Sequence, residues 1–138
     1  YAERGEGAMV NKKRLRVSNR TKFDGAMIAT GELRSTRSWH EQNIDVINKI
    51  GEESGSVCRL GACALDLSYV AAGRLEGFWE TGIKMWDVAA GMLIVEESLG
   101  KVTSLNQSDK NPLTSQSILA SNGTMHDKLE SLIGHVEQ

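Results

Sequence analysis

Apolar and polar positions change period several times along the chain, which predicts an alternation of strands and helices. In residues 7–17, Leu15 and Val17 alternate with Arg14 and Arg16, as in a half-buried strand, and the polar residues 11–13 predict a hairpin turn. Short apolar runs predict further strands over 25–30, 56–60, 77–80, 101–105 and 117–120. Residues 106–115 are polar and predict a loop.

Apolar residues at helical spacing predict the helices of the chain. These helices are expected over 38–50, 62–72, 87–97 and 124–136. In the first, Ser38 is a candidate N-cap and Glu41 completes a capping box. Ile44, Ile47 and Ile50 are expected on its apolar face. Strands alternating with helices favour an α/β fold in which helices cover the sheet.

The composition narrows the class of protein. The chain has 138 residues, 40% of them apolar, with 16 Lys and Arg against 18 Asp and Glu for a net charge of −2. This is the balance of an ordinary globular domain, and it gives no indication of nucleic acid or membrane as a partner. No apolar run approaches the roughly 18 residues of a membrane-spanning helix. The chain begins with Tyr1 rather than Met, so we expect that an N-terminal part is missing.

The cysteines and histidines exclude some chemistry. Cys58 and Cys63 are not spaced as a metal-binding pair, and no histidine is close in sequence, so no zinc site is expected. Both thiols are expected to be reduced, with Cys63 as a small packing residue. His40, His126 and His135 are expected at the surface.

Residues 59–91 hold three candidates for chemistry, and each has an ordinary structural alternative. Asp87 directly precedes an apolar helix, so it is either an N-cap or a carboxylate ligand of a hard cation such as Mg²⁺. Glu80 ends a short strand, so it is either a water-facing acid or an acceptor for substrate hydroxyls. Residues 61–63 are either a tight turn or a helix N-terminus that binds an anion or a sugar oxygen.

The sequence around these candidates resembles the inositol monophosphatase family, and its bacterial members most closely. Trp86-Asp-Val-Ala-Ala-Gly91 matches the C-terminal signature of that family, and it follows Gly61-Ala-Cys-Ala-Leu-Asp-Leu-Ser-Tyr-Val-Ala-Ala-Gly73 and Gly77-Phe-Trp-Glu80. Supporting matches lie at residues 3–8, at Ile28-Ala-Thr-Gly31 and at Ile118-Leu-Ala-Ser-Asn122. The resemblance covers nearly the whole chain and implies a layered α/β fold with a mixed β-sheet covered by helices.

The resemblance also implies roles for the candidates. Asp87 matches an aspartate that binds a catalytic Mg²⁺ and approaches the substrate, and Glu80 matches a glutamate that hydrogen-bonds substrate hydroxyls. Gly61, Ala62 and Cys63 match a segment whose backbone contacts the sugar-like ring. Ser35 and Arg37 fall near further substrate contacts of the family.

Other signatures of the family do not occur in the chain. These are a glutamate-led metal motif and an Asp-Pro-x-Asp-Gly-Thr element, which supply most of the metal-binding carboxylates in the family. We therefore expect the chain to be the C-terminal portion of an enzyme, with the N-terminal half absent, and to be inactive alone. Residues 1–37 would form the end of an N-terminal sheet region and its connection, and residues 38–138 the C-terminal α/β domain.

The function implied by the resemblance is Mg²⁺-dependent hydrolysis of a phosphate monoester of inositol or a related small polyol. The implied assembly is a homodimer, and the implied location is the cytoplasm. Alternative substrates within the same chemistry are histidinol phosphate, a sugar phosphate or a nucleotide 3′-phosphate. A different class of function, also left open, is a non-catalytic role in binding the transcription machinery.

Overall fold

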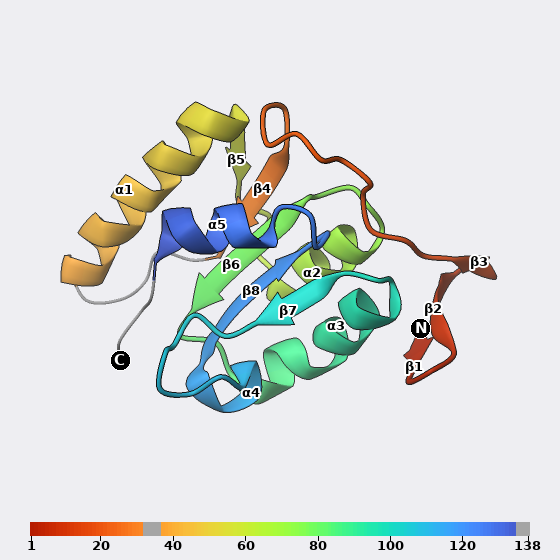
Figure 1. Ribbon diagram of the computed structural model, residues 1–138. Coiled ribbons are helices and arrows are strands. Elements are labelled where there is room, and N and C mark those ends of the chain that lie inside the picture. Colours follow the sequence, from red (N-terminus) through yellow and green to blue (C-terminus); the bar gives the residue numbers. More distant parts are fainter. Residues whose placement is uncertain (32–36, 135–138) are drawn as a thin grey trace.

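A mixed β-sheet forms the centre of the molecule (Figure 1). The structure, a computed structural model, describes the backbone of residues 1–31 and 37–134 and the side chains of 1–31 and 43–134. Within these residues the sheet runs in the order β5 (Ser56–Cys58), β4 (Met27–Thr30), β6 (Gly77–Thr81), β8 (Ser117–Ser121) and β7 (Lys101–Thr103). β4 is parallel to both β5 and β6, whereas β8 is antiparallel to β6 and β7. The predicted α/β class with a mixed sheet is confirmed.

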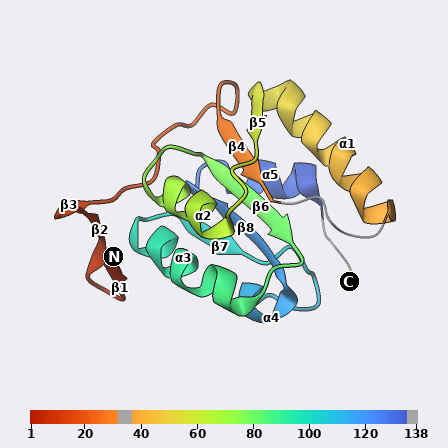
Figure 2. The same ribbon diagram turned by 180° about the vertical axis from the view of Figure 1, so that it is seen from behind.

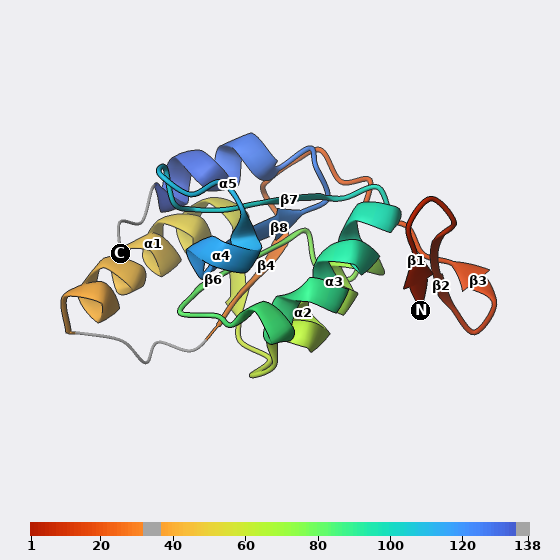
Figure 3. The same ribbon diagram turned by 90° about the horizontal axis from the view of Figure 1, so that it is seen from below.

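Helices cover both faces of this sheet (Figure 3). On one face lie α1 (Arg37–Ser54) and α5 (His126–Ile133), and on the other lie α2 (Cys63–Ala71) and α3 (Met85–Glu97). Because successive side chains of a strand point to opposite faces, β6 contributes Phe78 to the α2 and α3 side and Trp79 to the α1 and α5 side. Over the described residues, no helix is long and apolar enough to cross a bilayer.

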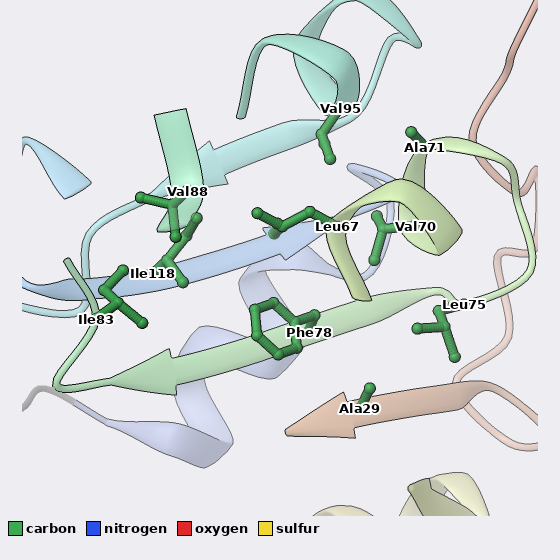
Figure 4. Close-up of a cluster of buried hydrophobic side chains, with 11 residues drawn as sticks. Ala29, Leu67, Val70, Ala71, Leu75, Phe78, Ile83, Val88, Val95 and Ile118 are labelled. Carbon is green, nitrogen blue, oxygen red and sulfur yellow. The ribbon is translucent and has the colours of Figure 1, made fainter. Parts of the chain in front are cut away.

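The core between α2, α3 and the sheet is drawn in Figure 4. Leu67 of α2, Phe78 of β6 and Val88 of α3 are each fully buried in it. The helices cross closely at Gly91 of α3, where the absence of a side chain leaves room for Leu67. An added Cβ on Gly91 would lie only 2.5 Å from Cδ1 of Leu67. Only glycine fits at this crossing without displacement of the leucine.

A small hairpin lies beside the end of α3, away from the main sheet (Figure 2). It is formed by β2 (Gly7–Val10) and β3 (Lys13–Arg14), and β1 (Ala2–Glu3) pairs with β2 to complete a three-stranded antiparallel sheet. The side chain of Glu97 in α3 accepts hydrogen bonds from the backbone N–H groups of Gly5 and Gly7, at 2.9 and 3.0 Å. These bonds lower the pKa of Glu97. The antiparallel pairing of β2 with β3 confirms the predicted hairpin, although β3 ends at Arg14 and does not include Leu15 and Val17.

Several details of the predicted elements are wrong. The predicted loop 106–115 contains a one-turn helix, α4 (Pro112–Ser115), which Asn111 caps by accepting from the N–H of Leu113. The helix predicted over 38–50 continues to Ser54, and Ile44 on its expected apolar face is 39% exposed. The side chains of Ser38 and Glu41 lie outside the described residues, so the capping box remains a prediction.

His126 is fully buried, which corrects the expected surface position. Its Nδ1 lies 2.8 Å from Ser121 Oγ, and its Nε2 lies 2.7 Å from Thr103 Oγ1. Ser121 Oγ already accepts from the N–H of Gly123, so its proton is available to Nδ1, and Nε2–H can then donate to Thr103. Burial, together with Lys101, lowers the pKa of His126 to about 4. His40 and His135 lie outside the described side chains.

Candidate active site

Every candidate that the resemblance places in residues 61–87 lines one cleft. Its volume is about 430 Å³. The lining residues are Gly61, Ala62, Cys63, Ala64, Glu80, Gly82, Ile83, Trp86 and Asp87. The parallel strands β5, β4 and β6 end at the same edge of the sheet, and the segments that follow β5 and β6 form the cleft. Ligand sites of α/β proteins are typical of this edge.

The first wall of the cleft is the start of α2. Gly61 has a φ of +85°, a left-handed conformation that favours glycine, so the chain can turn sharply between β5 and α2. Ala62 is extended at the N-cap position, and no described side chain caps the helix there. The first N–H groups of a helix have no partner within the helix, so this end can donate to an anion or a sugar oxygen.

Glu80 enters the cleft from the end of β6. The strand alternation places it on the same face as Phe78, the face covered by α2 and α3. Its side chain passes directly over Gly31, where a Cβ would lie 2.0 Å from Glu80 Cδ. Any side chain at the glycine that follows β4 would therefore displace the carboxylate of Glu80. In the sequence this glycine belongs to the supporting match Ile28-Ala-Thr-Gly31, which assigned it no role.

Asp87 lies in the first turn of α3 and is exposed in the cleft. Its Oδ2 accepts a hydrogen bond of 3.2 Å from the backbone N–H of Lys84, the residue at the N-cap position. The predicted N-cap position is therefore wrong, because α3 begins at Met85 and Asp87 is its third residue. From there its side chain accepts from the N–H of the true N-cap residue, and it also lines the cleft. Trp86 beside it is 77% exposed and also lines the cleft.

Cys63 is half-buried at the base of this wall. Burial first, and Glu80 second, raise the pKa of its thiol, so it stays protonated at neutral pH. A protonated thiol is a poor nucleophile, and the side chain of Cys63 packs against the core between α2, α3 and the sheet. This agrees with the expected packing role, although the side chain is less buried than predicted.

Asp66 is a buried acid that sequence reasoning did not single out. It is 1% exposed on α2, and burial, with Glu80 as the second cause, raises its pKa to about 7. Its Oδ1 has no hydrogen-bond partner among the described residues. The sequence signal that could have identified it is an acidic residue between Leu65 and Leu67 in a largely apolar helix.

Two further predicted residues cannot be placed. Ser35 lies outside the described residues, and Arg37 begins α1 but its side chain is outside them. Among the described side chains, no three His, Cys, Asp or Glu residues come together as a metal-binding group. The acids that line the cleft are Asp87 and Glu80, which offer carboxylate oxygens, the donors that Mg²⁺ prefers.

Comparisons with known proteins agree with this geometry. A sequence model of the inositol monophosphatase family matches residues 1–138. The inositol-1-monophosphatase of Caulobacter vibrioides is 41% identical over 130 residues, which cover 94% of this chain and 51% of that protein. The Nus factor SuhB of Escherichia coli K12 is 43% identical over 102 residues, covering 74% of this chain and 38% of that protein.

Solved structures show the same fold. The extragenic suppressor protein suhB of Bartonella henselae matches with a TM-score of 0.86 and 38% identity, over 95% of this chain and 50% of that chain. The inositol monophosphatase of Anabaena matches with a TM-score of 0.84 and 34% identity, over 96% and 52%. The chain spans about half the length of the curated relatives that it matches. On the match along its full length, the chain belongs to the inositol monophosphatase family.

Proposed function

We propose that this chain supplies part of the substrate and metal site of a Mg²⁺-dependent phosphatase that hydrolyses monoesters of inositol or a related polyol. The observation that carries the proposal is the cleft, in which Glu80, Asp87 and the start of α2 come together. Glu80 would bind hydroxyls, Asp87 a metal ion, and the start of α2 an anion or a sugar oxygen. A phosphorylated polyol needs all three.

The residues of the cleft fit Mg²⁺ by the chemistry of their donors. Asp87 is an exposed carboxylate and would hold the ion. When bound, Mg²⁺ supplies positive charge that stabilises the negative charge developing on the phosphate oxygens. Asp87 already accepts from the N–H of Lys84, which fixes the orientation of its carboxylate before a ligand arrives.

The other residues bind and orient the alcohol. Glu80 would accept hydrogen bonds from substrate hydroxyls, and Gly31 leaves the space in which its carboxylate lies. The N–H groups at the start of α2 would donate to oxygens of the ring or the phosphate. Holding the ester in one orientation lowers the entropic part of the barrier.

We also propose that the rest of the site lies outside this chain. Residues beyond it would supply further carboxylates, and the chain alone would be inactive. This agrees with the length of the relatives, of which the chain spans about half. Mg²⁺-dependent phosphatase activity of the purified 138-residue chain would contradict the proposal. A cytoplasmic homodimer is part of the same proposal, and sedimentation of the full-length protein tests the dimer.

The decisive variant is Asp87→Asn in the full-length protein. We expect kcat to fall at least about 100-fold, and the Mg²⁺ concentration for half-maximal rate to rise, because the amide is a weaker ligand for a hard cation. Steady-state kinetics at several Mg²⁺ concentrations measure both quantities. Asp127→Asn is the matched control, since Asp127 is also an exposed acid in the first turn of a helix. A near wild-type rate for Asp87→Asn at saturating Mg²⁺ would contradict the metal role.

The nature of the alcohol is tested through Glu80. If Glu80 accepts from hydroxyls, Glu80→Gln should raise KM about tenfold for inositol phosphate and leave p-nitrophenyl phosphate almost unchanged. A panel with histidinol phosphate, a sugar phosphate and a nucleotide 3′-phosphate then separates the alternatives. Equal effects on all substrates would remove Glu80 from the recognition of the alcohol.

A second function is favoured by the relatives named Nus factor SuhB, which are 41 to 44% identical to this chain. We propose it as an alternative, in which the protein binds the transcription machinery without catalysis. A pull-down of RNA polymerase and its factors with wild-type protein and with Asp87→Asn tests it. Capture that is unaffected by Asp87→Asn, together with no phosphatase activity of the wild type, would favour binding over catalysis.

A further inference from the structure

Asp66 is a buried acid that the proposed chemistry does not use. It is 1% exposed, and its Oδ1 has no hydrogen-bond partner among the described residues. An unpartnered polar atom in a protein interior is costly, and Leu or Ala would fill the same place in an apolar helix without that cost. A carboxyl group at this position therefore calls for a role that an apolar side chain cannot perform.

The position of Asp66 connects it to the cleft. It lies one turn after Cys63 on α2, so the two residues share a face of the helix, and Cys63 lines the cleft. Glu80 on β6 lies close enough to raise the pKa of Asp66, and Glu80 lines the same cleft. Asp66 is thus a buried acid directly behind the wall that would contact the substrate.

The groups around Asp66 do not neutralise it. Those that interact with it electrostatically are Glu80 of β6, Cys58 of β5 and Cys63 of α2, all acids or thiols. On α3 the acid at the cleft is Asp87, and β4 and β8 carry no charged residue. No described Lys or Arg forms an ion pair with it. Its pKa of about 7 means that its charge changes close to neutral pH.

We propose that ionisation of Asp66 weakens the binding of a phosphorylated polyol in the cleft, so that Asp66 acts through Glu80 as a positioning residue and makes substrate affinity depend on pH. The inference rests on the proposed function. When Asp66 is neutral, Glu80 accepts from hydroxyls with no second charge behind it. When Asp66 ionises, a second negative charge lies close to Glu80 and to the site of the anionic phosphate. This charge repels the phosphate and weakens the binding of hydroxyls by Glu80.

The test is the pH dependence of KM in the full-length protein. Wild type and Asp66→Asn are compared with inositol monophosphate between pH 5.5 and 9, with Asp127→Asn as a control that removes one exposed acid from the opposite face of the sheet. At pH 6 the KM of wild type and Asp66→Asn should agree. At pH 8.5 we expect the KM of wild type to be about threefold to tenfold higher than that of Asp66→Asn. The substrate phosphate also titrates in this range, but it affects both enzymes equally. Its contribution therefore cancels in the ratio of the two KM values.

The outcomes separate this inference from the proposed function. Hydrolysis with a KM ratio that does not change with pH overturns the inference and leaves the function intact. No hydrolysis by the wild type at any pH overturns both. Asp66→Ala is a second neutral variant and should show the same change of ratio if Asp66→Asn does not fold. A structural role alone would change stability without this pH dependence of KM.

Discussion

At the scale of single residues, the position of Glu80 in the cleft requires glycine at position 31. Gly31 follows β4, and the carboxylate of Glu80 occupies the space where its Cβ would be. The orientation of Glu80 is therefore determined partly by a strand that contributes no functional group. The space left by Gly31 supports the orientation of Glu80 in the same way as a neighbouring side chain would.

Gly31→Ala should displace Glu80 and weaken substrate binding. A Cβ placed 2.0 Å from Glu80 Cδ cannot be accommodated without movement of the carboxylate. We expect KM for the polyol phosphate to rise at least about tenfold, measured by steady-state kinetics on the full-length protein.

Gly51→Ala provides the matched control. Gly51 lies in α1, and its added Cβ would meet only Cγ2 of Val57 at an ordinary 3.9 Å. Alanine is also the better helix former, so stability should stay equal or rise slightly. Kinetics for Gly31→Ala that match those of Gly51→Ala would show that the space beside Glu80 does not matter.

At the scale of elements, α2 and α3 cross about one turn away from the helix starts that line the cleft. The two helices each begin at the cleft, with Cys63 and Asp87 in their first turns, and they cross closely where Leu67 packs over Gly91. Any change in the crossing would alter the spacing of the two helix starts. The packing of the core is in this way coupled to the spacing of the binding groups.

Gly91→Ala should destabilise the fold because the new Cβ would lie 2.5 Å from Leu67 Cδ1. Overpacking of this kind costs about 1 to 3 kcal/mol, which chemical denaturation measures. The second substitution Leu67→Val removes the clashing methyl group, so the double variant should lose less than the sum of the single losses. Strictly additive losses would show that the two residues do not pack as described.

At the scale of the whole molecule, His126 joins elements that are distant along the chain. It begins α5, and its ring bonds Thr103 of β7 and Ser121 of β8. The ring is neutral in the folded chain, since burial and Lys101 lower its pKa to about 4 from the ordinary 6.5. The unfolded chain would bind a proton over that interval, and the folded chain would not.

Stability should therefore fall as the pH drops from about 6.5 to about 4. The sign follows because the unfolded state binds more protons in this window, and the loss from this group amounts to roughly 3 kcal/mol at most. Denaturation of the chain at pH 4 to 7 measures the loss, and His126→Gln should flatten the curve. A histidine resonance of His126 that titrates near 6.5 in the folded chain would contradict the prediction.

The sequence predicted the order and type of the main elements because their apolar periods are strong. It also picked out five residues that line the cleft, through motif resemblance rather than through periodicity: Gly61, Ala62, Cys63, Glu80 and Asp87. It missed α4, although Asn111 before Pro112 is an ordinary helix start. It misplaced His126, because burial of a polar ring depends on partners in Thr103 and Ser121 that no local pattern reveals.

The groups behind the cleft were the least predictable part of the site. Gly31 is separated from Glu80 by many residues, and only the parallel pairing of β4 with β6 brings the two together. Asp66 was visible as an acid in an apolar helix, but its burial and the influence of Glu80 on its pKa are tertiary properties. Residues that act through space rather than through a motif require the fold to be known.

The cleft is nearly continuous in sequence, since its lining residues fall between Gly61 and Asp87. Such a segment can be inherited or exchanged as a unit, with α2, β6 and α3 carried together. Transfer of residues 61–87 between two relatives that differ in substrate should carry the choice of alcohol with it. The recipient would still supply the glycine after β4 and the groups that we propose lie outside this chain.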